Sequence, residues 1–112
     1  MWICLNDAFL SIFTDTTYPD QLLVRARRRG NIERVFGETE VIRNIGTDYR
    51  YRVRLPRATV ARAIADRIDG IDYPNFKDSV TDTERHAVYF HVWSVMYRYQ
   101  TLEYCPESED TL

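Results

Sequence analysis

The chain has few cysteines, which cross-link small disulfide-rich folds, and few glycines, which form phosphate-binding loops. It has two cysteines and four glycines in 112 residues. Cys4 and Cys105 show neither a metal-ligand spacing nor a redox motif, so we expect a cytoplasmic protein with reduced thiols and not a disulfide scaffold. No glycine-rich phosphate loop is present. No apolar run is long enough to cross a bilayer, so no membrane partner is expected.

Linker sequence is also missing from most of the chain. The apolar start, MWICLNDAFLSIF, has no basic leader and is interrupted by Asn6-Asp7, so we interpret it as structure and not as a signal peptide. A chain of this length suits one domain with one core. We therefore expect a single domain over residues 1–100, followed by an acidic, frayed tail over 101–112.

Lysine is nearly absent: the chain has a single lysine, Lys77, against fourteen arginines. Most of these arginines lie between residues 25 and 67, whereas residues 66–84 and the tail are acidic, and the net charge is only −2. A GC-rich genome explains such a bias without any function. The alternative is selection for the guanidinium group, which grips phosphate or carboxylate with two parallel hydrogen bonds.

The strands are predicted to cluster in the first half of the chain. The start is expected to form two strands around an Asn6-Asp7 turn, or else one bent strand. Residues 14–20 are rich in turn formers, and 21–27 alternate as a half-buried strand does. Residues 40–45 and 49–55 indicate a hairpin across IGTD.

Three helices are predicted from caps and spacing. Asn31 is expected to cap a short helix that ends before Gly37. Pro56 marks the start of a second helix that Gly70 ends. A capping box of Thr81 and Glu84 predicts a long helix over about 82–100. The expected fold class is α+β, a two-layer antiparallel sheet with helices packed on one face, strands mostly N-terminal and a long C-terminal helix.

The stretch DYRYRVRLPR, residues 48–57, gives the strongest functional signal. If Tyr49, Tyr51, Val53 and Leu55 face the helices, the alternating arginines face away. The strand 21–27 obeys the same rule, so five arginines are predicted to share one surface: Arg25, Arg27, Arg50, Arg52 and Arg54. Such a surface attracts phosphates, and Trp2 or Phe9 beside it would stack bases. A solvated face paired with carboxylates of this chain or of a second subunit is the alternative.

The helix 82–100 carries more apolar residues than one face needs. Val88, Val92, Val95, Met96 and Tyr99 form one stripe, which we interpret as the core face. A second, aromatic side is predicted to be a partner interface and consists of Tyr89, Phe90, Trp93 and Tyr97. A homodimer through these residues is expected, and burial under the N-terminal hairpin is the alternative.

Signals for catalysis are weak. His86 and His91 are five residues apart, about 140° around a helix, so they do not form a metal-binding pair. There is no nucleophile-elbow pattern, and no metal or cofactor is expected. A small enzyme with its site in residues 72–91 remains the alternative, because the connector after Gly70 mixes charged and aromatic residues.

Three segments of the sequence resemble a family of short bacterial and phage-associated proteins: MW..NDAFLSI, IDYxNFKxSV and VWxVM. The likeness spans residues 1–100, and the tail departs from it. The family has no established activity, so the resemblance implies a self-standing small domain and no reaction.

These features together predict a non-enzymatic module that binds an anionic partner, either nucleic acid or an acidic protein surface, through the arginine-rich sheet face. A phage-type inhibitor or regulator of a nucleic-acid-handling complex fits this size and charge pattern. A plain structural homodimer is the remaining alternative.

Overall fold

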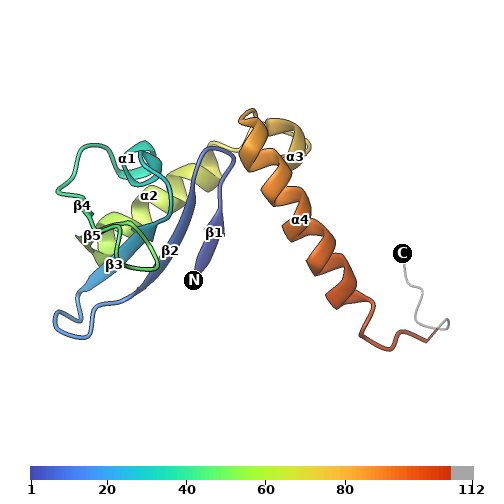
Figure 1. Cartoon of the computed structure of the whole chain (residues 1–112), viewed down its shortest axis with the longest axis horizontal. Coiled ribbons are helices and arrows are strands. Elements are labelled where there is room, and N and C mark those ends of the chain that lie inside the picture. Colours follow the sequence, from blue (N-terminus) through green and yellow to red (C-terminus); the bar gives the residue numbers. More distant parts are fainter. Residues whose placement is uncertain (107–112) are drawn as a thin grey trace.

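The structure is a computed structural model that describes residues 1–106, and it has the expected α+β architecture. Five antiparallel strands form one sheet in the order β1-β2-β3-β5-β4 (Figure 1). The elements are β1 (Trp2–Cys4), β2 (Phe9–Thr14), β3 (Gln21–Ala26), α1 (Asn31–Phe36), β4 (Ile42–Arg43), β5 (Tyr51–Pro56), α2 (Arg57–Asp69), α3 (Phe76–Ser79) and α4 (Thr83–Gln100). The clustering of the strands before α2 and the long C-terminal helix are confirmed.

The hydrophobic core lies between one face of the sheet and the helices α1 and α2. Alternate residues of each central strand point to this side, as Val24 does in β3 and Val53 in β5. Ile32 of α1 and Val60 of α2 close the layer from the other side. The buried cluster is Leu10, Ile12, Val24, Ala26, Ile32, Val53 and Val60. No residue of α3 or α4 belongs to it.

The strand predictions hold with small changes. β1 and β2 are two separate strands that pair antiparallel, with Trp2 opposite Ser11, so the alternative of one bent strand is wrong. β3 buries Val24 and Ala26 as the alternation predicted. The hairpin before α2 also forms, although β4 is only two residues long.

Two predicted helix caps are wrong, and each error has a physical reason. Gly30 precedes α1 with φ +86°, a conformation that glycine adopts at little cost. Asn31 is therefore inside the helix, where its buried side-chain oxygen accepts a hydrogen bond from the Phe9 N–H at 2.8 Å. At α4 the cap is not Thr81 but Asp82, whose carboxylate accepts from the Arg85 N–H at 2.9 Å.

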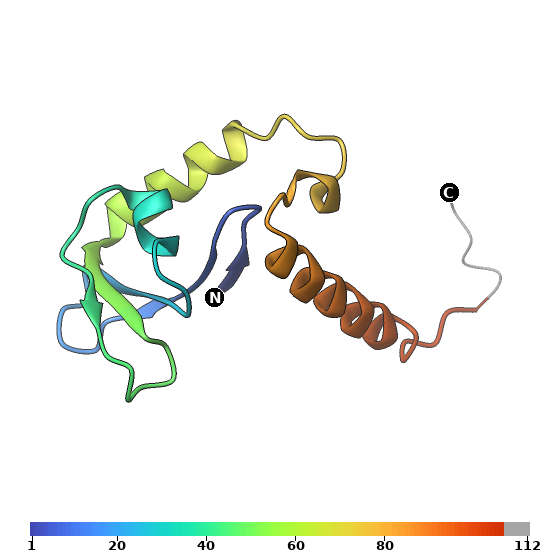
Figure 2. The same ribbon diagram turned by 45° about the horizontal axis from the view of Figure 1, so that its top comes forward.

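Helix α4 does not join the helical layer of the domain. The connector after α2 contains α3, capped by Asn75, and then sends α4 away from the sheet (Figures 1 and 2). The radius of gyration is 16.9 Å. A compact chain of this length would have a value of about 13 Å. The protein is therefore a small two-layer body with a helical arm.

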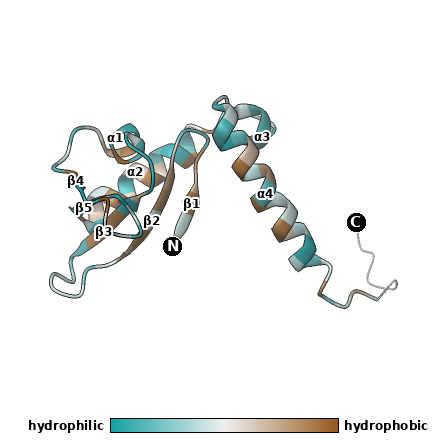
Figure 3. Cartoon of the chain, in the orientation of Figure 1, coloured by the Kyte–Doolittle hydropathy of each residue, from teal (hydrophilic) through white to brown (hydrophobic). Residues whose placement is uncertain are grey.

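The arm exposes apolar residues along most of its length, as the brown bands of α4 in Figure 3 show. The stripe expected to be the core face is exposed instead, with Val88 and Val95 both at 57 %. The helical period was predicted correctly, but no core layer of the described residues covers the stripe. Beyond α4, Leu102 and Tyr104 are exposed, and the predicted frayed tail lies outside the described residues from 107 onward.

Candidate functional site

The sheet face that points away from α1 and α2, called the open face below, carries the residues of interest. The strand register places side chains in rows across it, and one row runs from Trp2 through Ser11 and Arg25 to Arg52. The next row runs from Phe13 through Leu23 to Arg54. The open face thus has an apolar half on β1 and β2 and an arginine half on β3 and β5.

Arg25 is the centre of the arginine half. It lies directly opposite Arg52 in the antiparallel ladder between β3 and β5. Its guanidinium carbon is 4.4 Å from the ring centroid of Phe13 and 4.3 Å from that of Tyr49. One of its terminal nitrogens also donates to the Ser11 hydroxyl at 3.4 Å. Aromatic rings on both sides hold this cation in place at the surface.

The position of Tyr49 corrects one prediction. The strand alternation placed Tyr49 on the helix side, but it precedes β5, and its ring packs under Arg25 and Arg27. Tyr49 is only 3 % exposed because the two guanidinium groups cover it. The Tyr49 carbonyl accepts a further hydrogen bond from Arg52 at 3.4 Å. A buried tyrosine therefore organises three of the five predicted arginines.

Two carboxylates of the same chain neutralise part of the arginine half. Arg27 forms an ion pair with Asp48 at 3.1 Å, in which both side chains are largely exposed. Arg54 forms an ion pair with Asp15, whose side chain is only 4 % exposed, and also lies over the ring of Tyr18. The predicted alternative of internal carboxylate partners is therefore correct for these two arginines.

The remaining three arginines keep an uncompensated charge of about +3, obtained by subtracting two aspartates from five arginines. Arg50 is exposed and lies in the loop before β5. Arg25 and Arg52 are half-buried, and the Nε atom of each is buried without a hydrogen-bond acceptor among the described residues. Within the described residues no carboxylate forms an ion pair with Arg25, Arg50 or Arg52, so their charge is available to an anionic ligand.

The turn between β2 and β3 fixes the orientation of the Asp15 carboxylate. One of its oxygens accepts from the N–H of Thr17 at 2.9 Å and from that of Tyr18 at 3.3 Å, while the other pairs with Arg54. The Thr17 hydrogen bond, together with those of Tyr18 and Arg54, holds the pKa of the Asp15 carboxyl below its ordinary value. The local order of the turn therefore depends on an ionised Asp15.

We expect Asp15→Asn to remove part of the pH dependence of stability. Because the native pKa of Asp15 is lowered, its stabilising contribution is complete above the unfolded value of about 3.9 and is lost as the pH falls through the native value. Urea unfolding at intervals from pH 7 to pH 3 should show a constant gap between wild type and variant above pH ~5 and a shrinking gap below pH ~4. A gap that does not change across this range would contradict the assignment.

The predicted aromatic interface on α4 is split by the structure. Phe90, Trp93 and Tyr97 form an exposed row, with ring centroids 6.1 Å and 5.6 Å apart. Tyr89 does not belong to this row, which corrects the prediction that it lies at the interface. Its hydroxyl donates to the carbonyls of Leu5 and Ala8.

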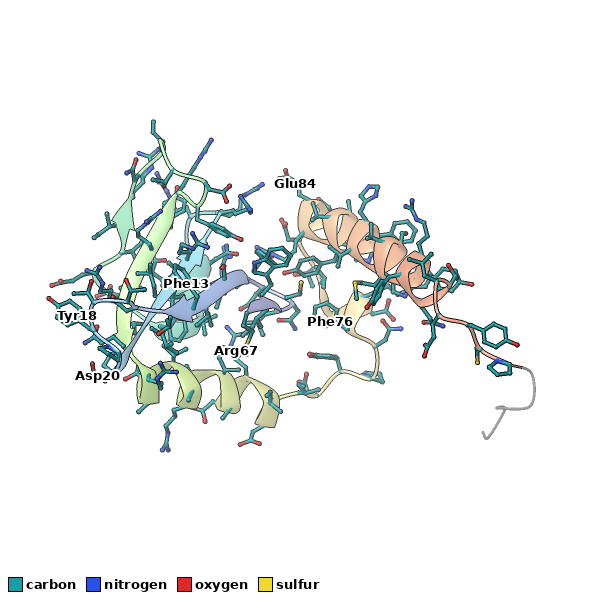
Figure 4. The ribbon with its side chains drawn as sticks, turned by 90° about the horizontal axis from the view of Figure 1, so that it is seen from below. Phe13, Tyr18, Asp20, Arg67, Phe76 and Glu84 are labelled. Carbon is teal, nitrogen blue, oxygen red and sulfur yellow. The ribbon has the colours of Figure 1, made fainter. Side chains whose placement is uncertain are left out.

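Tyr89 is therefore the anchor of α4 on the β1–β2 turn. Its ring stacks on Phe76 of α3 at 5.7 Å, and burial raises the pKa of its hydroxyl. The alternative that the N-terminal hairpin covers the aromatic side is thus correct for Tyr89 alone. Figure 4 labels Phe76 and Glu84 at this end of α4 and Phe13 and Tyr18 on the side of the sheet.

A pocket lies between the open face and the first half of α4. It has a volume of about 390 Å³, and its largely apolar lining includes Cys4 and Phe9 from the sheet and Val88 and Val92 from the helix. Loss of hydration there raises the pKa of the Cys4 thiol, so the thiol stays protonated. Of the region 72–91, the alternative enzyme site, Asp82, Glu84 and Arg85 line this pocket, whereas Tyr73, Asn75, Lys77 and His86 do not.

Residues 1–106, which the structure describes, contain no group of histidine, cysteine and acidic side chains arranged to hold a metal ion. None of their helices combines the length and apolar character needed to span a membrane.

Neither known protein families, nor curated proteins, nor solved structures gave a match to this chain. The assignment of the candidate site therefore rests on the geometry of its residues.

Several residues of the site were not predicted from the sequence. Ser11, Phe13 and Tyr18 contact the arginines, and Asp15 pairs with one of them. The pairing of Asp15 could have been anticipated, because an aspartate that accepts from the N–H two residues later is typical of an Asx-turn. The position of Tyr49 could not, because it depends on contacts with another strand.

Proposed function

We propose that the protein is a binding module that holds a single-stranded nucleic acid on the arginine half of its open face. The observation that carries this proposal is the pair of Arg25 and Arg52, which lie side by side on adjacent strands and have no carboxylate partner among the described residues. A phosphate oxygen placed between the two guanidinium groups would accept hydrogen bonds from both.

The rings beside the arginines support a nucleic acid over a simple anion. Phe13 and Tyr18 are 38 % and 53 % exposed and lie against Arg25 and Arg54. Proteins that bind single strands combine a basic track for phosphates with aromatic side chains on which bases stack. Phosphates on the guanidinium groups and bases on the exposed ring faces would use both features at once.

The shape of the sheet favours a single strand over duplex DNA. Strands lie about 4.8 Å apart, so the open face spans roughly 19 Å across its five strands. The major groove of DNA is about 12 Å wide and admits a helix or a two-stranded ribbon. A broad sheet face cannot enter such a groove but can carry a flexible strand along its surface.

The proposal includes the role expected from the sequence, a phage-type inhibitor or regulator of a nucleic-acid-handling complex that acts in the cytoplasm. A module that covers a single strand would deny it to such a complex. An acidic protein surface is the competing ligand, because carboxylates also fit paired guanidinium groups. The enzyme alternative in residues 72–91 has a pocket beside it, lined by Asp82, Glu84 and Arg85, but no pair of these side chains forms an established catalytic arrangement.

The test is a charge-matched pair of variants. Arg25→Gln with Arg52→Gln removes the central pair, and Arg62→Gln with Arg98→Gln removes two arginines from the helices. Binding of a labelled 20-nucleotide single strand, measured by gel mobility shift, is expected to weaken at least about 100-fold in the first variant, because hydrogen bonds to charged groups contribute ~1.5–3 kcal/mol each. The log–log salt slope should flatten by about 1.4, roughly 0.7 for each lost phosphate contact.

The control variant should retain wild-type affinity within about twofold, since its arginines lie on other surfaces. Equal losses in both variants would show that only net charge matters. Tighter binding to polyglutamate than to any single strand would assign the face to an acidic protein. Failure of the wild-type protein to bind any single strand would overturn the proposal.

A further inference from the structure

One side of helix α4 has the spacing of a coiled-coil seam. Val88, Val92, Val95 and Tyr99 are four, three and four residues apart, which is the alternation of the two apolar positions in a heptad. These four side chains, called the valine seam, are between 44 % and 69 % exposed. Seams of this kind pack against a second helix, whereas α3, which contacts α4, lies against Tyr89 and Trp93 and not against the valines.

The first half of the valine seam faces a groove. Val88 and Val92 line the 390 Å³ pocket together with Cys4 and Phe9, which belong to the apolar half of the open face. Beyond this pocket α4 runs away from the sheet (Figure 2). The occupant of this groove would touch valines on one side and the sheet on the other.

The other side of α4 is apolar as well. Phe90, Trp93 and Tyr97 are each about half exposed and lie opposite the valine seam, about 160° around the helix. The apolar half of the open face has a matching exposed ring, Trp2, which is 75 % exposed. A helix with a valine side and an aromatic side would therefore pack its valines on α4 and its rings on the apolar half of the open face.

We propose that this helix is α4 of a second copy of the chain, so that two copies exchange arms. Each α4 enters the partner's groove, packs its valine seam on the partner's valine seam, and turns its aromatic row toward Trp2 and Phe9 of the partner's sheet. The two helices run antiparallel about a two-fold axis, which gives both copies the same environment. Antiparallel helices also bring opposite ends of their dipoles together.

The exposed area is of the size that a stable dimer needs. Aromatic side chains present about 150–250 Å² each. The three rings of the row, Tyr99 and the valines therefore supply on the order of 600–800 Å² at their observed exposure, close to the ~800 Å² per partner of a standard interface.

Arg27 also lines the groove, but Arg25, Arg52 and Arg54 do not, so the exchange leaves these three arginines uncovered. The inference therefore does not depend on the proposed function. A dimer would, however, present two arginine faces on one particle.

The first experiment measures mass in solution by light scattering during gel filtration. The wild-type protein at ~50 µM is expected to have twice the mass of one chain. Val95→Glu should weaken the dimer at least about 100-fold, because two uncompensated carboxylates would be buried at the seam. Ser94→Glu, on the polar side of the same turn, is the matched control and should remain a dimer. Val95 is already half exposed within one chain, so the variant is expected to keep its circular dichroism spectrum.

The second experiment maps the contact and does not depend on stability. Cys4→Ser with Cys105→Ser gives a background without thiols, into which Val92→Cys, Val95→Cys or Ser94→Cys is introduced. Mild oxidation should cross-link the seam variants into dimers within minutes and leave Ser94→Cys monomeric. A monomeric wild-type protein at 200 µM, or a dimer that Val95→Glu leaves unchanged and the seam cysteines do not cross-link, would overturn the exchange and assign the groove to a different occupant.

Discussion

Tyr89→Ala is expected to lower the free energy of unfolding by about 3–4 kcal/mol, the range seen when a buried aromatic side chain is truncated. Tyr89 is 9 % exposed, stacks on Phe76 and donates its hydroxyl to the carbonyls of Leu5 and Ala8. Few other contacts hold α4 to the body, so the variant should release the arm as well. Urea unfolding followed by circular dichroism measures the loss.

Two further variants separate the contributions of Tyr89. Tyr89→Phe keeps the ring and removes the shared hydrogen bond to two carbonyls, which should cost about 1–2 kcal/mol. Tyr104→Ala makes the same truncation at a side chain that is 86 % exposed, and should change stability by less than ~0.5 kcal/mol. If Tyr89→Ala cost no more than Tyr104→Ala, Tyr89 would not be the anchor of the arm.

Leu10→Ala is expected to destabilise the protein by about 3–4 kcal/mol. Leu10 lies in β2, is fully buried and belongs to a cluster of only seven residues. A small domain has a total stability of about 5–15 kcal/mol, and here the sheet, α1 and α2 must supply most of it. We therefore expect a melting temperature at least about 12 °C lower, at ~4 °C for each kcal/mol.

The control for Leu10→Ala is Leu102→Ala, the same change at a side chain that is 82 % exposed. Calorimetry should give it a melting temperature within about 2 °C of wild type, corresponding to ~0.5 kcal/mol. A loss below 1 kcal/mol for Leu10→Ala would mean that the sheet and its two helices do not form the stability core.

The strands and the facing of the arginines could be predicted because both depend on short-range periodicity. In β3 and β5 every second residue is apolar, so Arg25, Arg52 and Arg54 had to lie on the opposite face from Val24 and Val53. Outside a strand, alternation no longer predicts the side to which a residue points. Tyr49 lies two residues before β5, and its orientation follows from the guanidinium groups of β3, which are distant in the sequence.

Local cap signals failed where a longer-range hydrogen bond competed with them. Asn31 has the side chain of an N-cap, but Gly30 makes the turn and frees the amide to bind the Phe9 N–H, 22 residues away. The period of α4 was also predicted correctly, yet periodicity says which residues share a side of a helix and not whether anything covers that side. The valines were therefore assigned to a core that the chain does not build around them.

The arrangement of body and arm has a consequence for spectroscopy. The protein has two tryptophans, and both lie outside the hydrophobic core: Trp2 is 75 % exposed at the edge of the sheet, and Trp93 is 51 % exposed on the arm. Their emission reports the polarity around the edge strand and the arm, while the packed interior of the protein contributes no indole signal. A change in indole emission would therefore register the covering or uncovering of the groove and would miss loosening of the core beneath the sheet.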